Sequence, residues 1–472
     1  MQSTPARRPM TTLWALAAGI ATGLAAAPAL AASAPAAPPG LAWGIPFLGI
    51  ILSLGLFPII APRFWRRRKG LVAALWTLAL LAPQAALIGP GFALESAWHA
   101  VLRDYLPFVT LLAAMFTVGG GILVQGGPWG RPGGNTLLLA LGTVLAGVVG
   151  PIAASMVLIH PLLRANAHRT RRVHLVVFFI ILVSNIGGVV TPLGNPPLYI
   201  GLLLGVPYAW PLRHLLVPLL LMALPLLAGF WVVDRHRAKA EPPPPPARRL
   251  RLRGHVNLLL LGVVIAGVLA QDWWQPGTVT LFGVSLGIER LAGMAVFGAV
   301  VALSAALTPR AVHEANMFSW TPILEVAKLF AAIFITITPA LAMLQAADHG
   351  PLAPLLRLTT DVLGRPNPIA YFWLAGTLSA FLDNAPTYLV FFQIAGNDAG
   401  QLTGTLSATL AALSAGAVMF GALTYIGNAP NLLVRSVAAH RGVRMPGFFG
   451  YMAISCALLL PLFAMLTLLF FR

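Results

Sequence analysis

Apolar runs of about 20 residues recur along the whole chain, and each is long enough to cross a bilayer as a helix. Hydrophobic residues make up 58% of the 472 residues and charged residues only 9%, with a mean hydropathy of +0.85. Water-soluble domains carry roughly a quarter charged residues. The sequence therefore predicts an all-α polytopic membrane protein. Its single cysteine, Cys456, excludes internal disulfides and a cysteine-based metal site.

The formal net charge of +18 comes from basic clusters in the short gaps between apolar runs, at 63–69, 164–172, 235–253 and 440–444. These gaps alternate with weakly charged ones, which is the positive-inside pattern of membrane proteins and not a nucleic-acid-binding surface. We therefore expect a multi-pass protein of the bacterial inner membrane. Its expected partners are membrane lipid, including anionic headgroups, and a small solute.

The N-terminal segment 1–31 has the features of a signal peptide. Arg7 and Arg8 precede an apolar stretch, and the sequence Ala-Leu-Ala at 29–31 is a suitable cleavage site. The alternative is an uncleaved first helix, and in both cases the next helix enters the membrane from the outside.

Ten segments are expected to span the membrane, at 44–61, 70–89, 104–125, 173–204, 214–233, 255–271, 289–307, 322–345, 406–438 and 448–471. Two further apolar segments, 135–163 and 368–395, are interrupted by Gly150-Pro151 and by the sequence Asp-Asn-Ala-Pro at 383–386. Each fits a re-entrant hairpin, which enters, turns and leaves on the same side. Treating both as hairpins also keeps most Lys and Arg residues on one side, with the ends of the first hairpin inside and those of the second outside.

The two halves of the chain share a motif. The sequence TPLGNPP at 191–197 matches TYIGNAP at 424–430, 233 residues later, and GTVLAGVVGPIA from Gly142 matches GTLSAFLDNAPT from Gly376 at an offset of 234. We therefore expect a first inverted repeat at 40–233, a cytoplasmic Pro/Arg-rich linker at 234–254 and a second inverted repeat at 255–472. Inverted repeats with broken helices are typical of secondary transporters that bind solute near the bilayer midplane.

The broken segments carry polar groups that can bind an ion or substrate, because Gly and Pro free backbone carbonyls and Asn supplies an amide oxygen. The first half offers Ser184, Asn185, Gly187, Gly188, Thr191, Gly194 and Asn195. The second half offers Asp383, Asn384, Thr387, Thr424, Gly427, Asn428 and Asn431. The alternative for a single Gly or Asn is close helix packing, which has no need to break a helix twice.

Only two carboxylates lie within the apolar segments, Asp383 and Glu325. A carboxylate at mid-membrane costs about 2.5–3.5 kcal/mol on insertion scales, so Asp383 is functional by default, with a capping role as the alternative. Na⁺ and a proton can compete for its oxygens. Glu325 lies three residues before Lys328 on one helix face, which predicts an internal ion pair. The alternative is that Glu325 and Lys328 take part directly in proton transfer.

These motifs resemble the ion transporter superfamily, which includes arsenite transporters, NhaD-type sodium/proton antiporters and citrate or dicarboxylate carriers. The nearest likeness is to a bacterial family labelled sodium:proton antiporter or citrate transporter, and it extends to "ILEVAKLFAAIF" and "MPGFFGYMA". The resemblance implies a scaffold domain that forms a homodimer, a mobile domain with the hairpins and broken helices, and elevator-like alternating access. It places Asn185, Gly194, Asn195, Asp383, Asn384, Thr387, Thr424 and Asn428 in the site. Relatives often have Asp where this chain has Asn195, and a polar residue in place of Leu423.

Two transport hypotheses follow. The favoured one is a sodium/proton antiporter in which Na⁺, held by Asn185, Asn195, Asp383, Asn384 and Asn428, alternates with H⁺. The alternative is a Na⁺- or H⁺-coupled carrier of citrate or a similar carboxylate, with the amides and helix N-termini holding the anion. No cofactor other than these ions is expected. An intramembrane enzyme is not expected, because the chain has no His-Glu-x-x-His or Gly-x-Ser-x-Gly motif.

Overall fold

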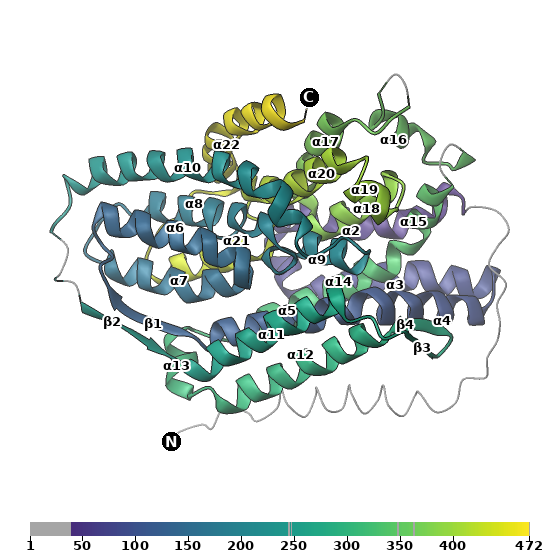
Figure 1. Ribbon diagram of the computed structural model, residues 1–472, viewed down its shortest axis with the longest axis horizontal. Helices are drawn as coiled ribbons and strands as arrows, with labels where there is room; N and C mark the ends of the chain where they lie inside the picture. Colours follow the sequence, from purple (N-terminus) through teal and green to yellow (C-terminus); the bar gives the residue numbers. More distant parts are fainter. Residues whose placement is uncertain (1–38, 244–245, 247, 347–348, 362–363, 472) are drawn as a thin grey trace.

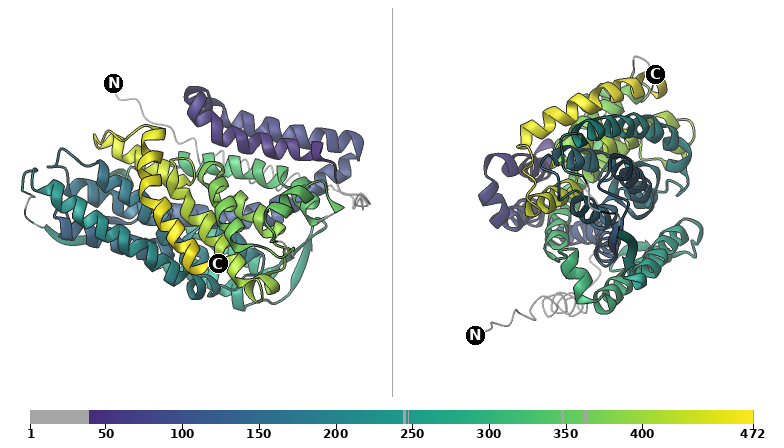
Figure 2. Two further views of the ribbon diagram at one scale, coloured as in Figure 1. Left: turned by 90° about the horizontal axis from the view of Figure 1, so that it is seen from above. Right: turned by 90° about the vertical axis from the view of Figure 1, so that its left-hand side faces the viewer.

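The structure is a computed structural model that describes residues 39–471 except 244–245, 247, 347–348 and 362–363. The predicted signal peptide, 1–31, lies outside these residues. In the described part of the chain, ten helices are long and apolar enough to cross a membrane. The protein is therefore an all-α polytopic membrane protein, as its composition predicts. Many of its long helices lie along the longest axis of the molecule, whereas α22 (Phe448–Phe470) crosses them obliquely (Figures 1 and 2).

In the first half, long helices precede a hairpin and a broken helix. The long helices are α2 (Ile45–Ile60), α3 (Pro62–Leu87), α4 (Pro90–His99) and α5 (Leu106–Gly120), the last two joined by a π-helical turn. The predicted first hairpin consists of α6 (Pro132–Val149) and α7 (Pro151–Ala165). The next span is broken, as its Gly and Pro residues predict, into α8 (Val173–Leu182), 3-10 turns at Ile186–Val190 and Pro192–Gly194, and α9 (Pro196–Leu203), and α10 (Trp210–Ala238) follows.

In the second half, helices again precede a hairpin, a broken span and a last long helix, and additional short helices lie between them. It opens with α11 (His255–Trp273), α12 (Ile288–Leu307), α13 (Arg310–Ala315), α14 (Thr321–Thr336), α15 (Thr338–Gln345) and α16 (Ala353–Leu358). The second hairpin is α17 (Pro368–Leu382) and α18 (Asn384–Ile394), followed by α19 (Ala399–Thr403). The second broken span is α20 (Ser407–Met419), a 3-10 turn at Phe420–Leu423 and α21 (Ala429–His440), before the last helix, α22 (Phe448–Phe470).

Two short antiparallel strand pairs were not expected from the sequence. Strand β1 (Leu123–Gly127) pairs with β2 (Arg248–Arg253), and β3 (Thr278–Leu281) pairs with β4 (Val284–Gly287). The segment expected as a linker, 234–254, thus contains the end of α10 and the whole of β2. The alternating Arg and Leu residues of β2 have the two-residue period of a strand, which the arginine content of this segment obscured.

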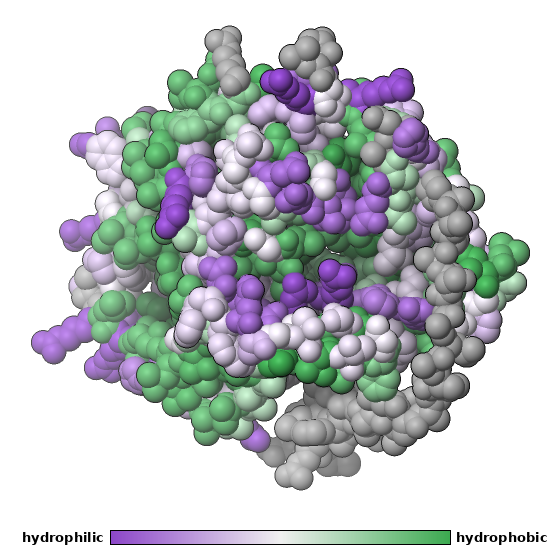
Figure 3. Space-filling model, turned by 45° about the vertical axis from the view of Figure 1, so that its right-hand side comes forward, coloured by the Kyte–Doolittle hydropathy of each residue, from purple (hydrophilic) through white to green (hydrophobic). Residues whose placement is uncertain are grey.

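The broken helix of the first half lies at the centre of the protein. The window Val173–Val190 is 94% buried, whereas α3 and α12 are each only 22% buried in their most apolar windows. The exposed sides of these outer helices are apolar and suit contact with lipid. In Figure 3 hydrophobic residues cover much of the surface, and hydrophilic residues gather across the middle of the face shown.

One end of the helix bundle carries 164–172, the described residues of 235–253, and 440–444, and is called the arginine-rich end below. There the buried carboxylate of Asp234 accepts hydrogen bonds from His174 Nε2 (2.8 Å) and Asn135 Nδ2 (3.0 Å) and pairs with Arg169. This cluster ties the start of α6 and α8 to the end of α10. Its charges are paired and hydrogen-bonded, as buried charges must be.

The exposed carboxylate of Glu241 holds the loop between α7 and α8 at the same end. It accepts hydrogen bonds from the backbone N–H groups of Thr170 and Arg171, both at 2.8 Å. The N–H of Thr170 is the main reason why the pKa of Glu241 lies below its usual value.

Candidate functional site

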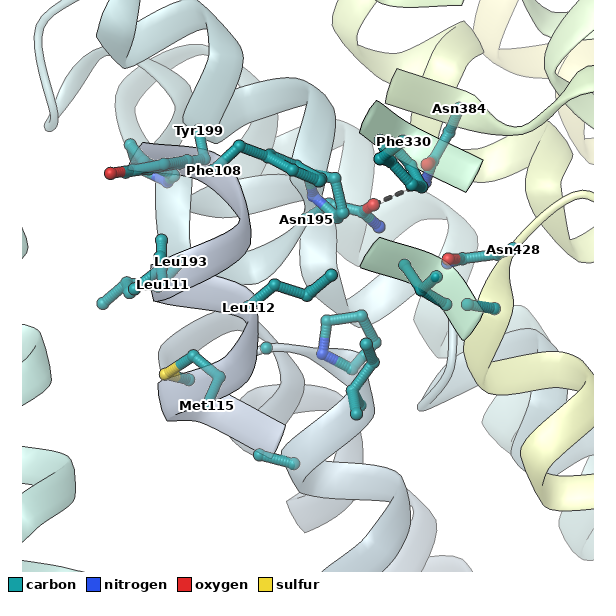
Figure 4. A pocket seen from close by; sticks show the side chains of 18 of the residues that line it. Phe108, Leu111, Leu112, Met115, Leu193, Asn195, Tyr199, Phe330, Asn384 and Asn428 are labelled. Carbon is teal, nitrogen blue, oxygen red and sulfur yellow. Dashed lines mark hydrogen bonds between the residues drawn. The ribbon is translucent and has the colours of Figure 1, made fainter. Parts of the chain in front are cut away.

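A cavity of about 50 Å³ lies where the two hairpins and the two broken helices meet. One wall consists of polar breaks from both halves, at Gly150–Pro151, Pro192–Pro196, Asp383–Asn384 and Asn428–Ala429. The opposite wall is apolar and comes from α5 and α14, with Phe108, Leu111, Leu112, Met115, Val326 and Phe330 (Figure 4). A volume of this size holds about two water molecules, each of which occupies about 30 Å³ in the liquid.

The tips of both hairpins have the same backbone geometry. Gly150 has φ 80° and ψ 154°, and Asp383 has φ 76° and ψ 147°. The two residues are 233 positions apart, the same offset as the duplicated Thr-x-x-Gly-Asn motif. The structural register therefore differs by one residue from the offset of 234 given by the sequence match at Gly142 and Gly376. A positive φ is normal for Gly and uncommon for Asp, so Asp383 holds a strained backbone at this tip.

The two threonines of the duplicated motif make equivalent hydrogen bonds. Thr191 Oγ1 donates to the carbonyl of Gly147 at 2.5 Å and accepts from Gly194 N at 3.1 Å. Thr424 Oγ1 donates to the carbonyl of Ala380 at 2.5 Å and accepts from Gly427 N at 3.0 Å. Each threonine thus fastens a broken helix to the hairpin of its own half, and it satisfies backbone groups that the break leaves without helical partners.

The glycines of the motif allow two backbone segments to touch. A Cβ on Gly188 would lie 2.1 Å from the carbonyl oxygen of Gly194, and one on Gly427 would lie 2.8 Å from that of Ala380. A Cβ on Gly187 would lie 2.3 Å from the carbonyl oxygen of Thr143 on α6. These glycines shape the breaks by close packing, so for Gly187 the packing alternative describes what the structure shows.

Two asparagine amides meet across the cavity wall. Asn384 Nδ2 donates to Asn195 Oδ1 at 2.5 Å (Figure 4). The remaining amide atoms, Asn195 Nδ2 and Asn384 Oδ1, are buried without a hydrogen-bond partner in the described structure. Buried polar atoms are nearly always paired, so one donor and one acceptor at the cavity are left for a bound solute.

Asn428 lines the cavity, while Ser184, Asn185 and Asn431 lie behind it. Asn428 Nδ2 donates to the carbonyl of Ser184 (3.0 Å) and to Asn185 Oδ1 (3.1 Å), and its Oδ1 points toward the cavity in Figure 4. Asn185 Nδ2 donates to Asn431 Oδ1 at 2.8 Å. Both polar atoms of Asn185 are therefore used within the protein. This residue, expected among the Na⁺ ligands, supports the site from behind and does not line the cavity.

Asp383 is the only carboxylic acid among the described residues that line the cavity. Its Oδ1 accepts a long hydrogen bond of 3.4 Å from Ala385 N, so it also caps α18, as the capping alternative predicts. Thr387 Oγ1 donates to the backbone carbonyl of Asp383 at 2.9 Å and stabilises the tip without lining the cavity. The weak cap leaves carboxylate oxygens able to bind a cation or a proton.

Four helices in the described structure begin at the cavity: α7 at Pro151, α9 at Pro196, α18 at Asn384 and α21 at Ala429. Helix N-termini carry partial positive charge, which favours anions, but the prolines in these first turns, Pro151, Pro196, Pro197, Pro386 and Pro430, have no N–H to donate. The ends of α6 and α17 also reach the cavity or its edge, and they add carbonyl groups of the opposite sign. The arrangement offers separate positions for an anion and a cation.

The predicted pairing of Glu325 with Lys328 is wrong. Glu325 forms an ion pair with Lys69 of α3, and the Lys328 side chain is exposed, with its stem near Gly70. The residues of α14 that reach the cavity are Val326 and Phe330, so the two charges lie on another face of the helix. The pair joins α3 to α14 away from the cavity. The prediction considered only partners on the same helix and therefore missed Lys69 of α3.

Sequence reasoning missed the apolar wall of the cavity and Tyr199. Tyr199 of α9 lines the cavity and donates a 3.4 Å hydrogen bond to Gln271 of α11. Apolar residues on membrane helices carry no signal that separates a cavity wall from lipid-facing or packed positions. The one sequence feature that could have indicated Tyr199 as a cavity residue is its position two residues after the duplicated motif at 191–197.

A profile of the family described as "Putative citrate transport" matches residues 37–471 of the chain. The matched range includes both hairpins, both broken helices and all residues that line the cavity. No curated protein sequence matches the chain. Because the family match covers nearly the whole length, the protein is a multi-pass membrane transporter that belongs to the "Putative citrate transport" family.

Proposed function

We propose that the protein is a secondary transporter that carries a small carboxylate anion such as citrate, coupled to Na⁺ or H⁺ at Asp383. The observation that carries this proposal is the convergence of four helix N-termini and the free Asn195 amide donor on a cavity with a single acid. The family description supports the same substrate class.

The coupling between cation binding and anion binding follows from the negative charge of Asp383. An ionised Asp383 repels a carboxylate in the same cavity by about 4 kcal/mol at 4 Å and an effective dielectric constant of 20. A Na⁺ or proton on Asp383 removes this repulsion. Binding of the cation therefore raises the affinity for the anion roughly a thousandfold, which links the two solutes in one transport step.

The sodium/proton antiporter remains the competing hypothesis, because Asp383 with the oxygens of Asn384 and Asn428 could hold a cation alone. Exchange of cations makes no use of the four helix N-termini, which disfavour a cation nearby. With Lys328 outside the cavity, these N-termini and the amide donors are the groups that would hold an anion. We therefore favour the carboxylate carrier over the antiporter.

The cavity is too small for a tricarboxylate as it stands, so transport requires the polar wall to move against the apolar wall of α5 and α14. Helices α6, α7, α8 and α10 reach farther toward the arginine-rich end than α2 and α3 do (Figure 2). This offset fits a mobile domain displaced along a scaffold, with the arginine-rich end in the cytoplasm. We further propose a homodimer in the bacterial inner membrane.

The test is uptake by proteoliposomes that contain the purified protein. Labelled citrate should accumulate under an imposed Na⁺ or pH gradient and should fail to accumulate without one. Na⁺ flux driven by a pH gradient in the absence of any carboxylate would contradict the proposal and favour the antiporter. Succinate, sulfate and phosphate serve as competing anions to define the substrate class.

A further inference from the structure

A second cavity, of about 770 Å³, opens at the arginine-rich end between the strand pair β1–β2 and the end of α7. It is far larger than the central cavity and lies in the usual size range of ligand sites. Its polar lining comes from Arg164 of α7, Arg249 and Arg251 of β2, Gln125 of β1 and Trp129. No acidic residue is among its described lining residues.

The strand β2 directs its arginines to one face. Arg249 and Arg251 are two residues apart, so both side chains point to the same side of the strand, toward the cavity. Leu250 and Leu252 occupy the other face and are 61% and 37% exposed. Gln125 of β1 is the strand partner of Arg251, which places it beside these charges.

The charges of this cavity have no counterion in the described structure. Arg164 donates one hydrogen bond, from Nη2 to the carbonyl of Val124 at 3.0 Å, and neither it nor Arg249 or Arg251 forms an ion pair. The nearby carboxylates of Asp234 and Glu241 are committed to Arg169, His174 and the loop N–H groups. The buried Nε1 of Trp129 also lacks a partner, although indole N–H groups usually find one.

We propose that this cavity is a binding site for an anion with more than one negative charge, held by Arg164, Arg249 and Arg251. Guanidinium groups form paired hydrogen bonds with phosphate and carboxylate oxygens, and such an anion relieves their mutual repulsion. The shared chemistry is that of a free polyanion or of a phospholipid headgroup at the membrane surface.

Occupancy of the cavity would join two parts of the protein. Arg164 lies near the end of α7, and the first residues of the same helix line the central cavity. Arg249 and Arg251 belong to the segment that connects the two halves of the chain. A bound polyanion would therefore fix the first hairpin to this segment.

The test measures binding without transport, so its result does not depend on the proposed function. The full chain is reconstituted in phosphatidylcholine nanodiscs, and binding of labelled inorganic pyrophosphate is measured at constant ionic strength. We expect one site per chain and, in R249Q/R251Q, an affinity at least about tenfold lower for each lost arginine. The matched control, R131Q/R310Q, removes two exposed arginines that do not line the cavity and should bind as the wild type does.

A second arm replaces part of the phosphatidylcholine by phosphatidylglycerol. Weaker pyrophosphate binding in these discs, together with arginine-dependent retention of phosphatidylglycerol through purification, would identify the headgroup as the occupant. Pyrophosphate binding that is unchanged by phosphatidylglycerol would identify a free polyanion. Equal affinities of the two double variants, or no binding of either probe, would overturn the proposal. Thermal unfolding of each variant shows whether a loss of binding reflects a loss of fold.

Discussion

Asn384 Nδ2 donates a 2.5 Å hydrogen bond to Asn195 Oδ1, and this bond joins the second hairpin to the broken helix of the first half across 189 residues of sequence. Two residues that the sequence places in different repeats thus share one contact at the cavity. Because one half of each amide stays unpaired beside it, the contact both fastens the two halves together and presents a donor and an acceptor to a solute.

Replacement of Asp383 by Asn should abolish coupling while leaving the fold nearly intact. The variant D383N keeps a side-chain oxygen for the cap of α18 but cannot bind Na⁺ or a proton as a carboxylate does. We expect citrate uptake in proteoliposomes that no longer responds to a Na⁺ or pH gradient. The matched control is D398N, since Asp398 caps α19 at the exposed surface through a 3.1 Å bond from Gln401 N. Gradient-driven uptake by D383N at the wild-type rate would refute the role of Asp383.

An acid at position 195 should weaken anion binding and change the pH profile. In N195D the new carboxylate lies beside Asn384 and adds a second negative charge to the cavity wall. Repulsion should raise the KM for citrate by about 10–100-fold at pH values where the introduced carboxylate is ionised. Acid pH protonates this carboxylate and restores affinity, so uptake by the variant should fall more steeply with rising pH than uptake by the wild type. An unchanged profile would place position 195 outside the site.

Loss of either motif threonine should destabilise the protein by a similar amount. T191V removes a hydroxyl that bonds the carbonyl of Gly147 and the N–H of Gly194. T424V removes one that bonds the carbonyl of Ala380 and the N–H groups of Ile426 and Gly427. Each group left unpaired costs about 1–3 kcal/mol. Thermal unfolding in detergent measures the effect. T136V is the control, because Thr136 donates to the carbonyl of Pro132 within its own helix and should change stability by less than about 0.5 kcal/mol. A strong effect in only one of the two motif variants would show that the repeats are not equivalent.

Glu325 should be dispensable for coupling. It pairs with Lys69 at a partly exposed position, where ion pairs contribute about 0–1 kcal/mol. E325Q should therefore take up citrate with the gradient response of the wild type and unfold at nearly the same temperature. Loss of the Na⁺ or pH response in E325Q, with the fold intact, would revive the proton-relay hypothesis.

The broken helices and the hairpins could be predicted because Gly, Pro and Asn inside apolar runs leave a local signal. TPLGNPP and TYIGNAP both mark the ends of half-helices, and Asp383 lies at the hairpin tip as expected. The residues that face the cavity could not be separated from those behind it. Asn185 and Asn195 look alike in sequence, yet Asn185 is held by Asn428 and Asn431, whereas Asn195 lines the cavity.

Partners from distant elements were also beyond the reach of local patterns. Lys69, which replaces Lys328 as the partner of Glu325, comes from a helix more than 200 residues away in the chain. The apolar wall of α5 and α14 is set by helix packing, and residues such as Leu112 resemble any other residue of a membrane helix. The arginines of β2 could be recognised as basic, but their pairing with β1 beside a cavity depends on the tertiary fold.

The positive φ of Asp383 allows an expectation for directed evolution of this protein. Its counterpart at the other tip is Gly150, the residue type that adopts this conformation without strain. Selection for heat resistance alone should favour glycine at position 383 and so discard the acid. At the tip of the second hairpin, thermal stability favours glycine, whereas coupled transport requires aspartate.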